Sequence, residues 1–257
     1  GLSGFVGQHL QAYLQQHSEL GYRIVHTQEP IELTQAHRLE KAIQHTMPDA
    51  VIHLAAQSHV PTSFKDPRTT FEVNFTGTLN LLEALQTAQF KGRFLFVGSG
   101  DMYGQVPTEH MPIKEEFALK PRNPYAVSKV AAEALCYQWS QHADFDIMMA
   151  RPFNHIGPKQ SPHFAIPDFA QQIMKIKQGK QTPQLITGDI DVSRDFSDVR
   201  DIVAAYLAIL ADGRSGEVYN VGSGQDHTIR FLIEKMLQLA GVDASIHIDP
   251  ARLRPNE

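Results

Sequence analysis

Four short segments carry closely spaced apolar residues and predict β-strands. Residues 50–55, 94–97 and 146–150 are nearly continuous apolar runs, as expected of strands that are buried on both faces. Residues 22–26 form a shorter run of the same kind. Strands buried on both faces occur in parallel sheets, where helices cover each side.

Helices are predicted between these runs, where apolar residues recur every three or four positions. One helix covers residues 5–17, and the next follows Thr34, whose hydroxyl can cap a helix N-terminus. A long helix begins at Asp66-Pro67 and another follows Pro124, because proline is favoured in the first turn of a helix. Strands and helices therefore alternate along the chain.

This alternation predicts an α/β fold: a doubly wound parallel sheet of the Rossmann type, with helices on both faces. After Arg151 the sequence has shorter elements and loops rich in Pro, Gly and His, which predicts a smaller C-terminal lobe. We assign residues 1–152 and about 190–222 to the Rossmann domain, and about 153–189 and 223–257 to a substrate-binding lobe.

The composition is that of a globular protein and argues against several functional classes. The 257 residues carry a net charge of -5, which provides no basic surface for nucleic acid or for an anionic membrane. No apolar run approaches the roughly 20 residues that span a bilayer. The single cysteine, Cys136, cannot form an internal disulfide, so we expect a reducing, cytoplasmic location. The 13 histidines show no metal-ligand spacing, so no metal is expected.

The two ends of the chain suggest a fragment. The chain starts at Gly1, inside a glycine-rich turn, and no segment before it supplies the strand that such a turn follows. It ends abruptly at Arg254-Pro255-Asn256-Glu257. We therefore expect a longer protein, whose first strand is missing from this sequence.

The first seven residues, Gly1-Leu2-Ser3-Gly4-Phe5-Val6-Gly7, form a G-x-x-G-x-x-G turn that leads into a helix. Glycines allow the backbone to approach a pyrophosphate closely. The helix N-terminus adds N–H donors and a positive potential. The turn therefore predicts a dinucleotide-binding site.

A tyrosine and a lysine stand four residues apart in Tyr125-Ala126-Val127-Ser128-Lys129, so they share one face of the helix after Pro124. A nearby ammonium favours the phenolate and lowers the pKa of a tyrosine. Tyr125 is thus a candidate general acid/base. Ser99 follows the strand 94–97, at the sheet edge where α/β proteins bind ligands, and can hydrogen-bond a substrate oxygen.

The glycine turn, the strand-end serine and the Tyr/Lys pair occur in this order in the extended short-chain dehydrogenase/reductases, the NAD(P)-dependent epimerase/dehydratase family, and the chain resembles that family over nearly its whole length. Further segments that match are His53-Leu54-Ala55-Ala56, Asn74-Phe75-Thr76-Gly77-Thr78, Arg151-Pro152-Phe153-Asn154 and Arg194-Asp195-Phe196-Ser197-Asp198-Val199.

The resemblance implies a set of site residues. The catalytic residues would be Ser99, Tyr125 and Lys129. The cofactor-binding residues would be Gly1, Ser3, Gly4, Phe5, Val6, Gly7, Glu32, Leu54, Ala55, Ala56, Asn74, Tyr125 and Lys129. The substrate-binding residues would be Ser99, Asp101, Asn154, His155 and Arg194, with Asn154 and Arg194 on the diphosphate. A homodimer is also implied, formed through the Tyr125 helix and residues 67–88.

The cofactor is expected to be NADH or NADPH. An acid at the end of the second strand would favour NAD, and an arginine would favour NADP. Here that strand runs into His26-Thr27-Gln28-Glu29, which has neither signature clearly. The choice between the two cofactors therefore stays open.

Within the family, Ala55-Ala56-Gln57-Ser58-His59-Val60 and Phe153-Asn154-His155 resemble both the GDP-mannose 4,6-dehydratases and the GDP-4-keto-6-deoxy-D-mannose reductases. Ser99-Gly100-Asp101-Met102-Tyr103-Gly104 and residues 188–196 are more similar to the reductases, which make GDP-D-rhamnose. In the dehydratases a glutamate, the base for C5, lies two residues after the strand-end Ser/Thr, where this chain has Asp101.

We therefore expect NAD(P)H-dependent reduction of the 4-keto group of a GDP-4-keto-6-deoxyhexose. The alternatives are a GDP-mannose 4,6-dehydratase, another sugar-nucleotide epimerase or dehydratase, and a non-catalytic NAD(P)-sensing protein. The presence of Ser99, Tyr125 and Lys129 together argues against the last of these, because a sensor does not need all three.

Overall fold

The computed structural model describes residues 1–27 and 31–252. The chain divides into two compact units. Unit 1 comprises Gly1–Phe153 and Arg200–Val221, and unit 2 comprises Asn154–Val199 and Gly222–Glu257. The sequence suggested that the chain returns to the first domain at about residue 190. In the structure the chain enters unit 1 again at Arg200, ten residues later than predicted. The reason is that the strand just before Arg200 pairs with strands of unit 2.

Unit 1 is built on a parallel sheet whose described strands run in the order β1-β2-β3-β7. They are β1 (Ala50–His53), β2 (Arg93–Val97), β3 (Asp146–Pro152) and β7 (Val218–Val221). The three long apolar runs of the sequence thus form neighbouring strands, and the predicted α/β fold with a parallel sheet is confirmed. The fourth predicted strand, residues 22–26, is not one: it pairs with no strand of the described chain.

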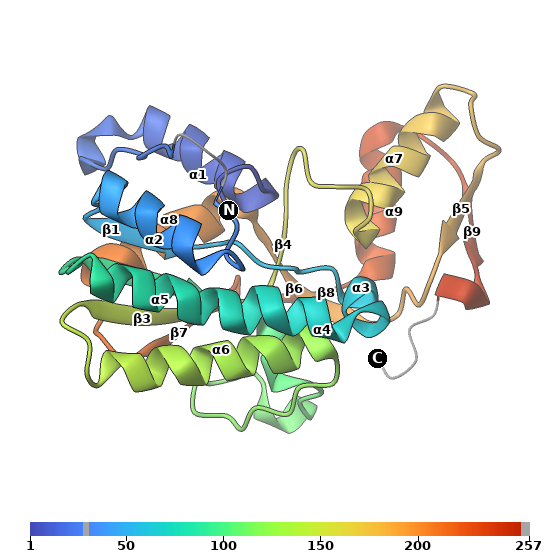
Figure 1. Ribbon diagram of the computed structural model, residues 1–257. Coiled ribbons are helices and arrows are strands. Elements are labelled where there is room, and N and C mark those ends of the chain that lie inside the picture. The colour runs from blue at the N-terminus through green and yellow to red at the C-terminus, as the bar shows by residue number, and fades with distance from the viewer. Residues whose placement is uncertain (28–30, 253–257) are drawn as a thin grey trace. The chain divides into compact units, whose positions relative to one another are not determined.

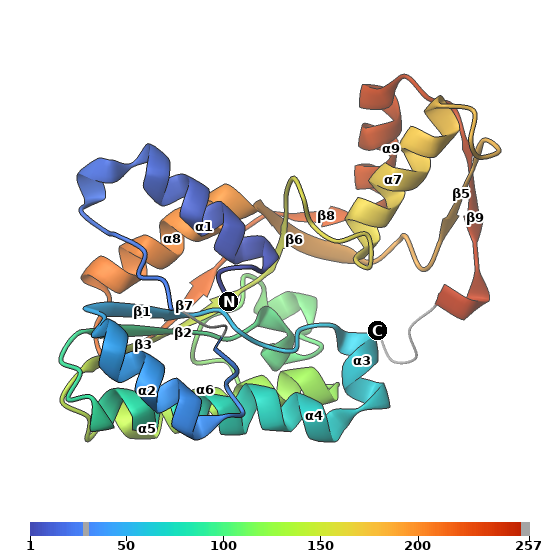
Figure 2. The same ribbon diagram turned by 45° about the horizontal axis from the view of Figure 1, so that its top comes forward.

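Helices cover both faces of this sheet (Figures 1 and 2). One face carries α1 (Phe5–Gln16) and α8 (Val199–Asp212), and the other carries α2 (Ala36–Thr46), α5 (Gly77–Thr87) and α6 (Pro124–Ser140). Leu82, Phe94 and Ile147 are fully buried in the core beneath α5 and α6. Leu95, Met148 and Tyr206 form the core beneath α8. The double covering explains why the strands are apolar on both faces.

Two of the three helix N-termini predicted from capping residues and prolines are found in the structure. The Asp66 carboxylate accepts a hydrogen bond from the Thr69 N–H at 3.0 Å, and the Asn123 side chain accepts one from the Ala126 N–H at 2.7 Å. The cap predicted at Thr34 is wrong, because α2 begins after Gln35 and has no side-chain cap. The long helix is also interrupted. It runs as α4 (Pro67–Phe71), a π-helical segment (Glu72–Thr76) and α5.

Short elements complete unit 1. They are α3 (Val60–Lys65) and the 3₁₀ turns Ser18–Leu20, Gly100–Tyr103 and Thr108–His110. The turn Gly100–Tyr103 follows directly on β2 and carries the residues next to Ser99. It therefore brings the chain to the edge of the sheet where the predicted site lies.

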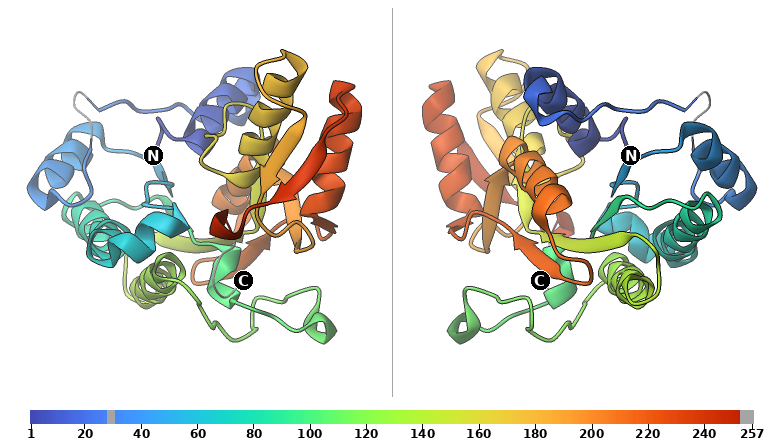
Figure 3. Two further views of the ribbon diagram at one scale, coloured as in Figure 1. Left: turned by 90° about the vertical axis from the view of Figure 1, so that its right-hand side faces the viewer. Right: turned by 90° about the vertical axis from the view of Figure 1, so that its left-hand side faces the viewer.

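The described part of unit 2, up to residue 252, has two small sheets and two longer helices (Figure 3). In the first sheet, β6 (Ser193–Asp198) pairs in parallel with β4 (Asn154–Ile156) and antiparallel with β8 (Asp226–Thr228). In the second, β5 (Gln184–Thr187) pairs with β9 (Ser245–Ile248). Helices α7 (Ala165–Lys177) and α9 (Ile229–Ala240) pack through a core that includes Phe169, Leu185 and Ile233. A 3₁₀ turn, Pro250–Arg252, follows β9.

Candidate active site

Lys129 contacts the C-terminal end of β2, and Ser99 follows this end of the strand. The last residue of β1, His53, lies opposite Phe96, so the ladder between β1 and β2 stops before Val97. The Lys129 ammonium donates a hydrogen bond to the Val97 carbonyl at 2.7 Å. It also lies 4.8 Å from the centroid of the Phe96 ring. Lys129 therefore supplies a partner for a carbonyl that β1 leaves unpaired, two residues before Ser99.

Tyr125 is buried in the first turn of α6, and the Ser99 side chain lies near enough to affect the pKa of its phenol. Burial raises the pKa of the Tyr125 phenol above its ordinary value, and the nearby Asp101 carboxylate acts in the same direction. The Ser99 side chain partly offsets this rise. The phenol is therefore neutral near pH 7 and can donate a proton, so the three predicted catalytic side chains come together at one strand end.

The electrostatic role predicted for Lys129 is not seen in this structure. Burial lowers the pKa of the Lys129 ammonium to about 8. Among the described residues, the groups that shift the pKa of Tyr125 are Asp101 and Ser99, besides burial. The physical reason is that the Lys129 ammonium points to the Val97 carbonyl.

The glycine turn at residues 1–7 fits a pyrophosphate. Gly4 is the N-cap of α1 and provides no side-chain cap. A Cβ on Gly7 would lie 2.3 Å from the Gly1 carbonyl oxygen, and a Cβ on Gly1 would lie 2.8 Å from the Ala55 nitrogen. Glycines therefore allow the turn, with Ser3 at its tip, to pack against Leu54-Ala55 and leave a helix N-terminus for an anion.

Asn74 makes its side-chain contacts within the protein. Its Nδ2 donates to the Gln57 carbonyl at 3.0 Å and to the Ser128 hydroxyl at 2.9 Å, and its Oδ1 accepts from the Gln57 N–H at 2.8 Å. Both amide hydrogens are therefore used. Gln57 directly follows the predicted cofactor-binding stretch Leu54-Ala55-Ala56, so Asn74 braces that loop.

Glu32, one of the predicted cofactor-binding residues, is exposed just before α2. Its carboxylate accepts a hydrogen bond from the Gln35 side chain at 2.7 Å. Gln28 and Glu29, which bear on the choice between NADH and NADPH, lie outside the described residues.

The residues around Ser99 leave little space beside position 100. The Ser99 hydroxyl accepts a hydrogen bond from the Asp101 N–H at 3.2 Å. A Cβ on Gly100 would lie 2.8 Å from the Phe153 ring, which itself stacks on Tyr103 with centroids 6.3 Å apart. A larger side chain, such as an acid, would therefore collide with Phe153 at position 100. The only carboxylate of the Ser99-Gly100-Asp101 segment belongs to Asp101.

The remaining predicted substrate residues belong to unit 2. Asn154 and His155 lie on β4, opposite Phe196 and Ser197 of β6. Arg194 lies on the same strand β6 and donates a hydrogen bond to the Ser193 carbonyl at 2.8 Å. Asn154 and Arg194 are thus on paired strands, two positions out of register.

A buried polar network next to Ser99 was not predicted from the sequence. The Arg151 guanidinium contacts the Glu133 carboxylate through two hydrogen bonds of 2.9 and 2.5 Å. It also donates to the Tyr103 hydroxyl at 2.7 Å and to the Glu115 carbonyl at 2.8 Å. The Tyr103 hydroxyl donates to Asn220 of β7 at 2.7 Å. The motif Arg151-Pro152-Phe153-Asn154 contains the arginine, but nothing in the sequence indicates its partners.

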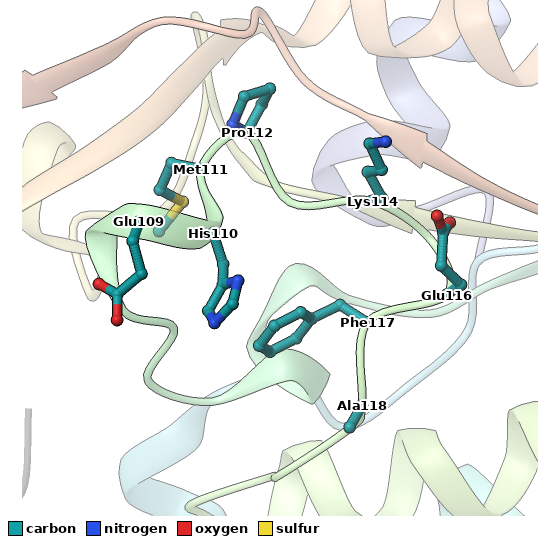
Figure 4. Close-up of a pocket in the computed structure, with 8 residues that line it drawn as sticks. All are labelled: Glu109, His110, Met111, Pro112, Lys114, Glu116, Phe117 and Ala118. Carbon is teal, nitrogen blue, oxygen red and sulfur yellow. The ribbon is translucent and has the colours of Figure 1, made fainter.

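The network also anchors the loop after the Gly100–Tyr103 turn. This loop surrounds a pocket of about 480 Å³ lined by residues Glu109–Pro112, Lys114 and Glu116–Ala118 (Figure 4). The rings of His110 and Phe117 face each other there, with centroids 5.2 Å apart. The pocket is formed by the loop itself and does not include the predicted catalytic residues.

Two further features of residues 1–27 and 31–252 bear on function. No group of three or more His, Cys, Asp or Glu side chains in this part of the chain could hold a metal ion. No helix there is both long and apolar enough to cross a bilayer.

Comparisons with known proteins identify relatives of this chain. A family model described as GDP-mannose 4,6 dehydratase matches residues 25–256. GDP-6-deoxy-D-mannose reductase of Pseudomonas aeruginosa is 50% identical over 257 residues, which are 100% of this chain and 84% of that protein. GDP-mannose 4,6 dehydratase 1 of Arabidopsis thaliana is 31% identical over 232 residues, which are 88% of this chain and 63% of the plant protein.

A solved structure is also similar. The Pseudomonas aeruginosa protein RMD, complexed with NADPH, matches with a TM-score of 0.95 and 49% identity, over 100% of this chain and 85% of that one. The similarity extends over both units, including the glycine turn and the Ser99, Tyr125 and Lys129 segments. The chain therefore belongs to the GDP-mannose 4,6-dehydratase family of Rossmann-type, NAD(P)-dependent sugar-nucleotide enzymes.

Proposed function

We propose that this chain reduces the 4-keto group of a GDP-4-keto-6-deoxyhexose to give a GDP-6-deoxyhexose such as GDP-D-rhamnose. The single observation that carries this proposal is the strand-end segment Ser99-Gly100-Asp101 beside Tyr125. The Ser99 side chain lies near the Tyr125 phenol, which is the proton donor. Position 100 is a glycine, whereas the dTDP-glucose dehydratases have an aspartate at this place as the acid for water loss. The 50% identity to a GDP-6-deoxy-D-mannose reductase supports the same reaction.

Each of the three catalytic side chains would have its own role in the reduction. Bound NAD(P)H would supply hydride to C4 of the sugar. Tyr125, kept neutral by burial, would donate its phenolic proton to the C4 oxygen. Ser99 would hydrogen-bond the keto oxygen. Lys129 would hold the cofactor ribose while its contact with Val97 maintains the position of the strand end.

Separate sets of residues would bind the cofactor and the substrate. The turn Gly1–Gly7 and the loop Leu54–Ala56 would contact the cofactor, with Glu32 near the adenine. Asn154, His155 and Arg194 of unit 2 would contact the substrate, Asn154 and Arg194 at its diphosphate. Arginine suits that role because its guanidinium can donate two parallel hydrogen bonds to phosphate oxygens. Asp101 would accept a hydrogen bond from a sugar hydroxyl.

The rival within this family is a 4,6-dehydratase. That reaction removes a proton from C5 and expels the C6 hydroxyl as water, so it needs a base aimed at C5 besides the tyrosine. In the dehydratases that base is a glutamate at the position of Asp101, whose side chain is one methylene shorter. A misplacement of about 1 Å can cost about 10²-fold in rate, so elimination is disfavoured.

The test compares both reactions in one preparation. Protein is incubated with GDP-4-keto-6-deoxymannose and either NADPH or NADH, and cofactor oxidation is followed at 340 nm. A parallel sample receives GDP-mannose and the oxidised cofactor, and its sugar nucleotides are separated by chromatography. The proposal predicts rapid cofactor oxidation and little 4-keto product. Formation of the 4-keto sugar at a rate equal to or above the reduction would favour the dehydratase instead.

We also infer a homodimer and a cytoplasmic location. Helix α6 exposes Val127, Ala134 and Tyr137, which suits an interface between two copies. The single buried cysteine, Cys136, and the use of NAD(P)H suit a reducing compartment.

A further inference from the structure

A buried serine inside the Tyr/Lys motif connects two parts of unit 1 that the reaction needs. Ser128 is fully buried on α6, between Tyr125 and Lys129. Its hydroxyl donates a hydrogen bond to the Tyr125 carbonyl at 2.6 Å and accepts one from the Asn74 amide at 2.9 Å. A serine hydroxyl has one donor and two acceptor sites. One hydroxyl therefore contacts both the peptide of the proton donor and a residue 54 positions away.

Asn74 extends the connection to the cofactor side. Its amide exchanges two hydrogen bonds with the backbone of Gln57, whose N–H and carbonyl are both engaged. Gln57 follows Leu54-Ala55-Ala56, and the first two of these residues contact the glycine turn through Gly1. The loop at the end of β1 is thus tied through Asn74 and Ser128 to the turn of α6 that presents Tyr125.

The Asn74 end is itself held in place. Asn74 lies in the π-helical segment Glu72–Thr76, and its backbone carbonyl accepts a hydrogen bond from the Thr78 hydroxyl at 2.7 Å. That hydroxyl is in contact with Nε2 of His53 at 2.9 Å. Because the hydroxyl proton is already donated to Asn74, the His53 ring donates here through Nε2–H. All four residues, His53, Thr78, Asn74 and Ser128, are buried.

We propose that Ser128 is a positioning residue: through Asn74 it holds the Tyr125 turn of α6 in register with the cofactor-side loop at Gln57. The inference rests on the proposed reductase function. Without the Ser128 hydroxyl, the Asn74 amide keeps the Gln57 carbonyl but loses its second acceptor, and the Tyr125 turn and the loop are no longer joined. The distance between the phenol and the reacting carbonyl then varies more, and hydride and proton transfer become slower.

The test is Ser128→Ala, which removes the hydroxyl with little change in volume. We expect turnover to fall about 10-fold to 10²-fold, as for a small misplacement of a catalytic group, while the KM for the sugar nucleotide stays within about twofold. The kinetic isotope effect with NADPH deuterated at the transferred position should increase, because hydride transfer becomes rate-limiting. A purely structural role would lower the midpoint of thermal unfolding but leave turnover per folded molecule and the isotope effect unchanged.

Ser140→Ala is the matched control. Ser140 lies on the same helix and donates the same kind of hydrogen bond, to the Tyr137 carbonyl at 2.7 Å, but away from Tyr125. Its turnover should equal that of the wild type. If Ser128→Ala does not unfold cooperatively, Ser128→Cys, which keeps a weak donor of similar size, is measured in its place. In a double-mutant cycle, adding Asn74→Ala to Ser128→Ala should lower turnover little further, because both substitutions break the same hydrogen bond between Asn74 and Ser128.

The outcomes separate the two proposals. An inactive wild type would contradict the proposed function. An active wild type together with a folded Ser128→Ala of equal turnover and unchanged isotope effect would overturn the positioning role alone.

Discussion

At the scale of single residues, burial determines which protonation states the site uses. Tyr125 and His53 are both buried, yet burial acts on them in opposite directions because the charged form is an anion in one case and a cation in the other. It raises the pKa of the Tyr125 phenol and lowers the pKa of the His53 imidazole to about 3. Both side chains are therefore neutral at pH 7.

The neutral phenol leads to the first prediction. Replacing Tyr125 by Phe removes the proton donor without opening a cavity, so turnover should fall by about 10²-fold or more, the usual contribution of general acid catalysis. Cofactor affinity, measured by the fluorescence of bound NADPH, should change little. Tyr137→Phe, on the exposed side of α6, is the control. Near-normal turnover of Tyr125→Phe would contradict the assigned role.

The neutral imidazole leads to a prediction about acid stability. In the unfolded chain His53 gains a proton as the pH falls through 6.5, whereas in the folded chain it stays neutral until about pH 3. The unfolded state therefore binds more protons between these values, and the folded state loses about 1.4 kcal/mol per pH unit there. In His53→Gln the free energy of unfolding should fall less steeply between pH 6 and 4, measured by urea denaturation.

The control for that experiment is His142→Gln, since His142 is exposed. Its pH dependence should match that of the wild type. Parallel curves for His53→Gln and the wild type would show that the imidazole is protonated in the folded protein.

At the scale of elements, the ends of strands and helices form the site. The parallel sheet places the C-terminal ends of β1 and β2 side by side, and the shorter β1 leaves the Val97 carbonyl to Lys129. The glycine turn leads directly into the N-terminus of α1, where Gly4 provides no side-chain cap and the positive end of the helix favours an anion. A π-helical segment places Asn74 where it reaches both the Gln57 loop and α6.

The glycine turn supports a graded prediction. A Cβ on Gly7 would lie 2.3 Å from the Gly1 carbonyl oxygen and 2.6 Å from the Leu2 Cα, so Gly7→Ala must displace the backbone of the turn. We expect NADPH affinity to fall at least about tenfold, or about 1.4 kcal/mol, in isothermal titration. A Cβ on Gly4 meets the same oxygen at 3.2 Å, so Gly4→Ala should weaken binding less. Equal affinities for both variants would argue against the turn as the phosphate site.

At the scale of the whole molecule, the exposed side of α6 bears on assembly. Val127 and Ala134 are seven residues apart on this helix, and both are exposed. Residues at this spacing lie on one side of a helix. A homodimer would cover this apolar side of unit 1.

The prediction for assembly uses Ala134→Glu. Glutamate is a good helix former, so an isolated chain should fold normally, whereas a carboxylate buried at an interface without a partner would oppose association. Light scattering should give twice the 28.8 kDa chain mass for the wild type and a single chain mass for the variant. Ala12→Glu, on the exposed side of α1, should leave the dimer intact. A monomeric wild type would refute the homodimer.

The sequence by itself predicted three strands of the central sheet and the candidate residues of the site. Three apolar runs predicted β1, β2 and β3, because strands that are covered on both faces have nearly continuous apolar sequences. The four-residue spacing of Tyr125 and Lys129 placed both on one side of a helix, and the position of Ser99 after β2 placed it at the binding edge of the sheet. These inferences depend on local periodicity, which short windows of sequence contain.

Only the tertiary structure decided the partners of those residues. The Lys129 ammonium binds the Val97 carbonyl because β1 ends one residue too early to pair with it. Arg151 donates hydrogen bonds to Glu133, and Asn74 donates one to Ser128, which is 54 residues away in the sequence. The segment 22–26 reads as a strand but has no strand to pair with in the described chain. Such contacts depend on packing between segments remote in sequence, and no local pattern specifies them.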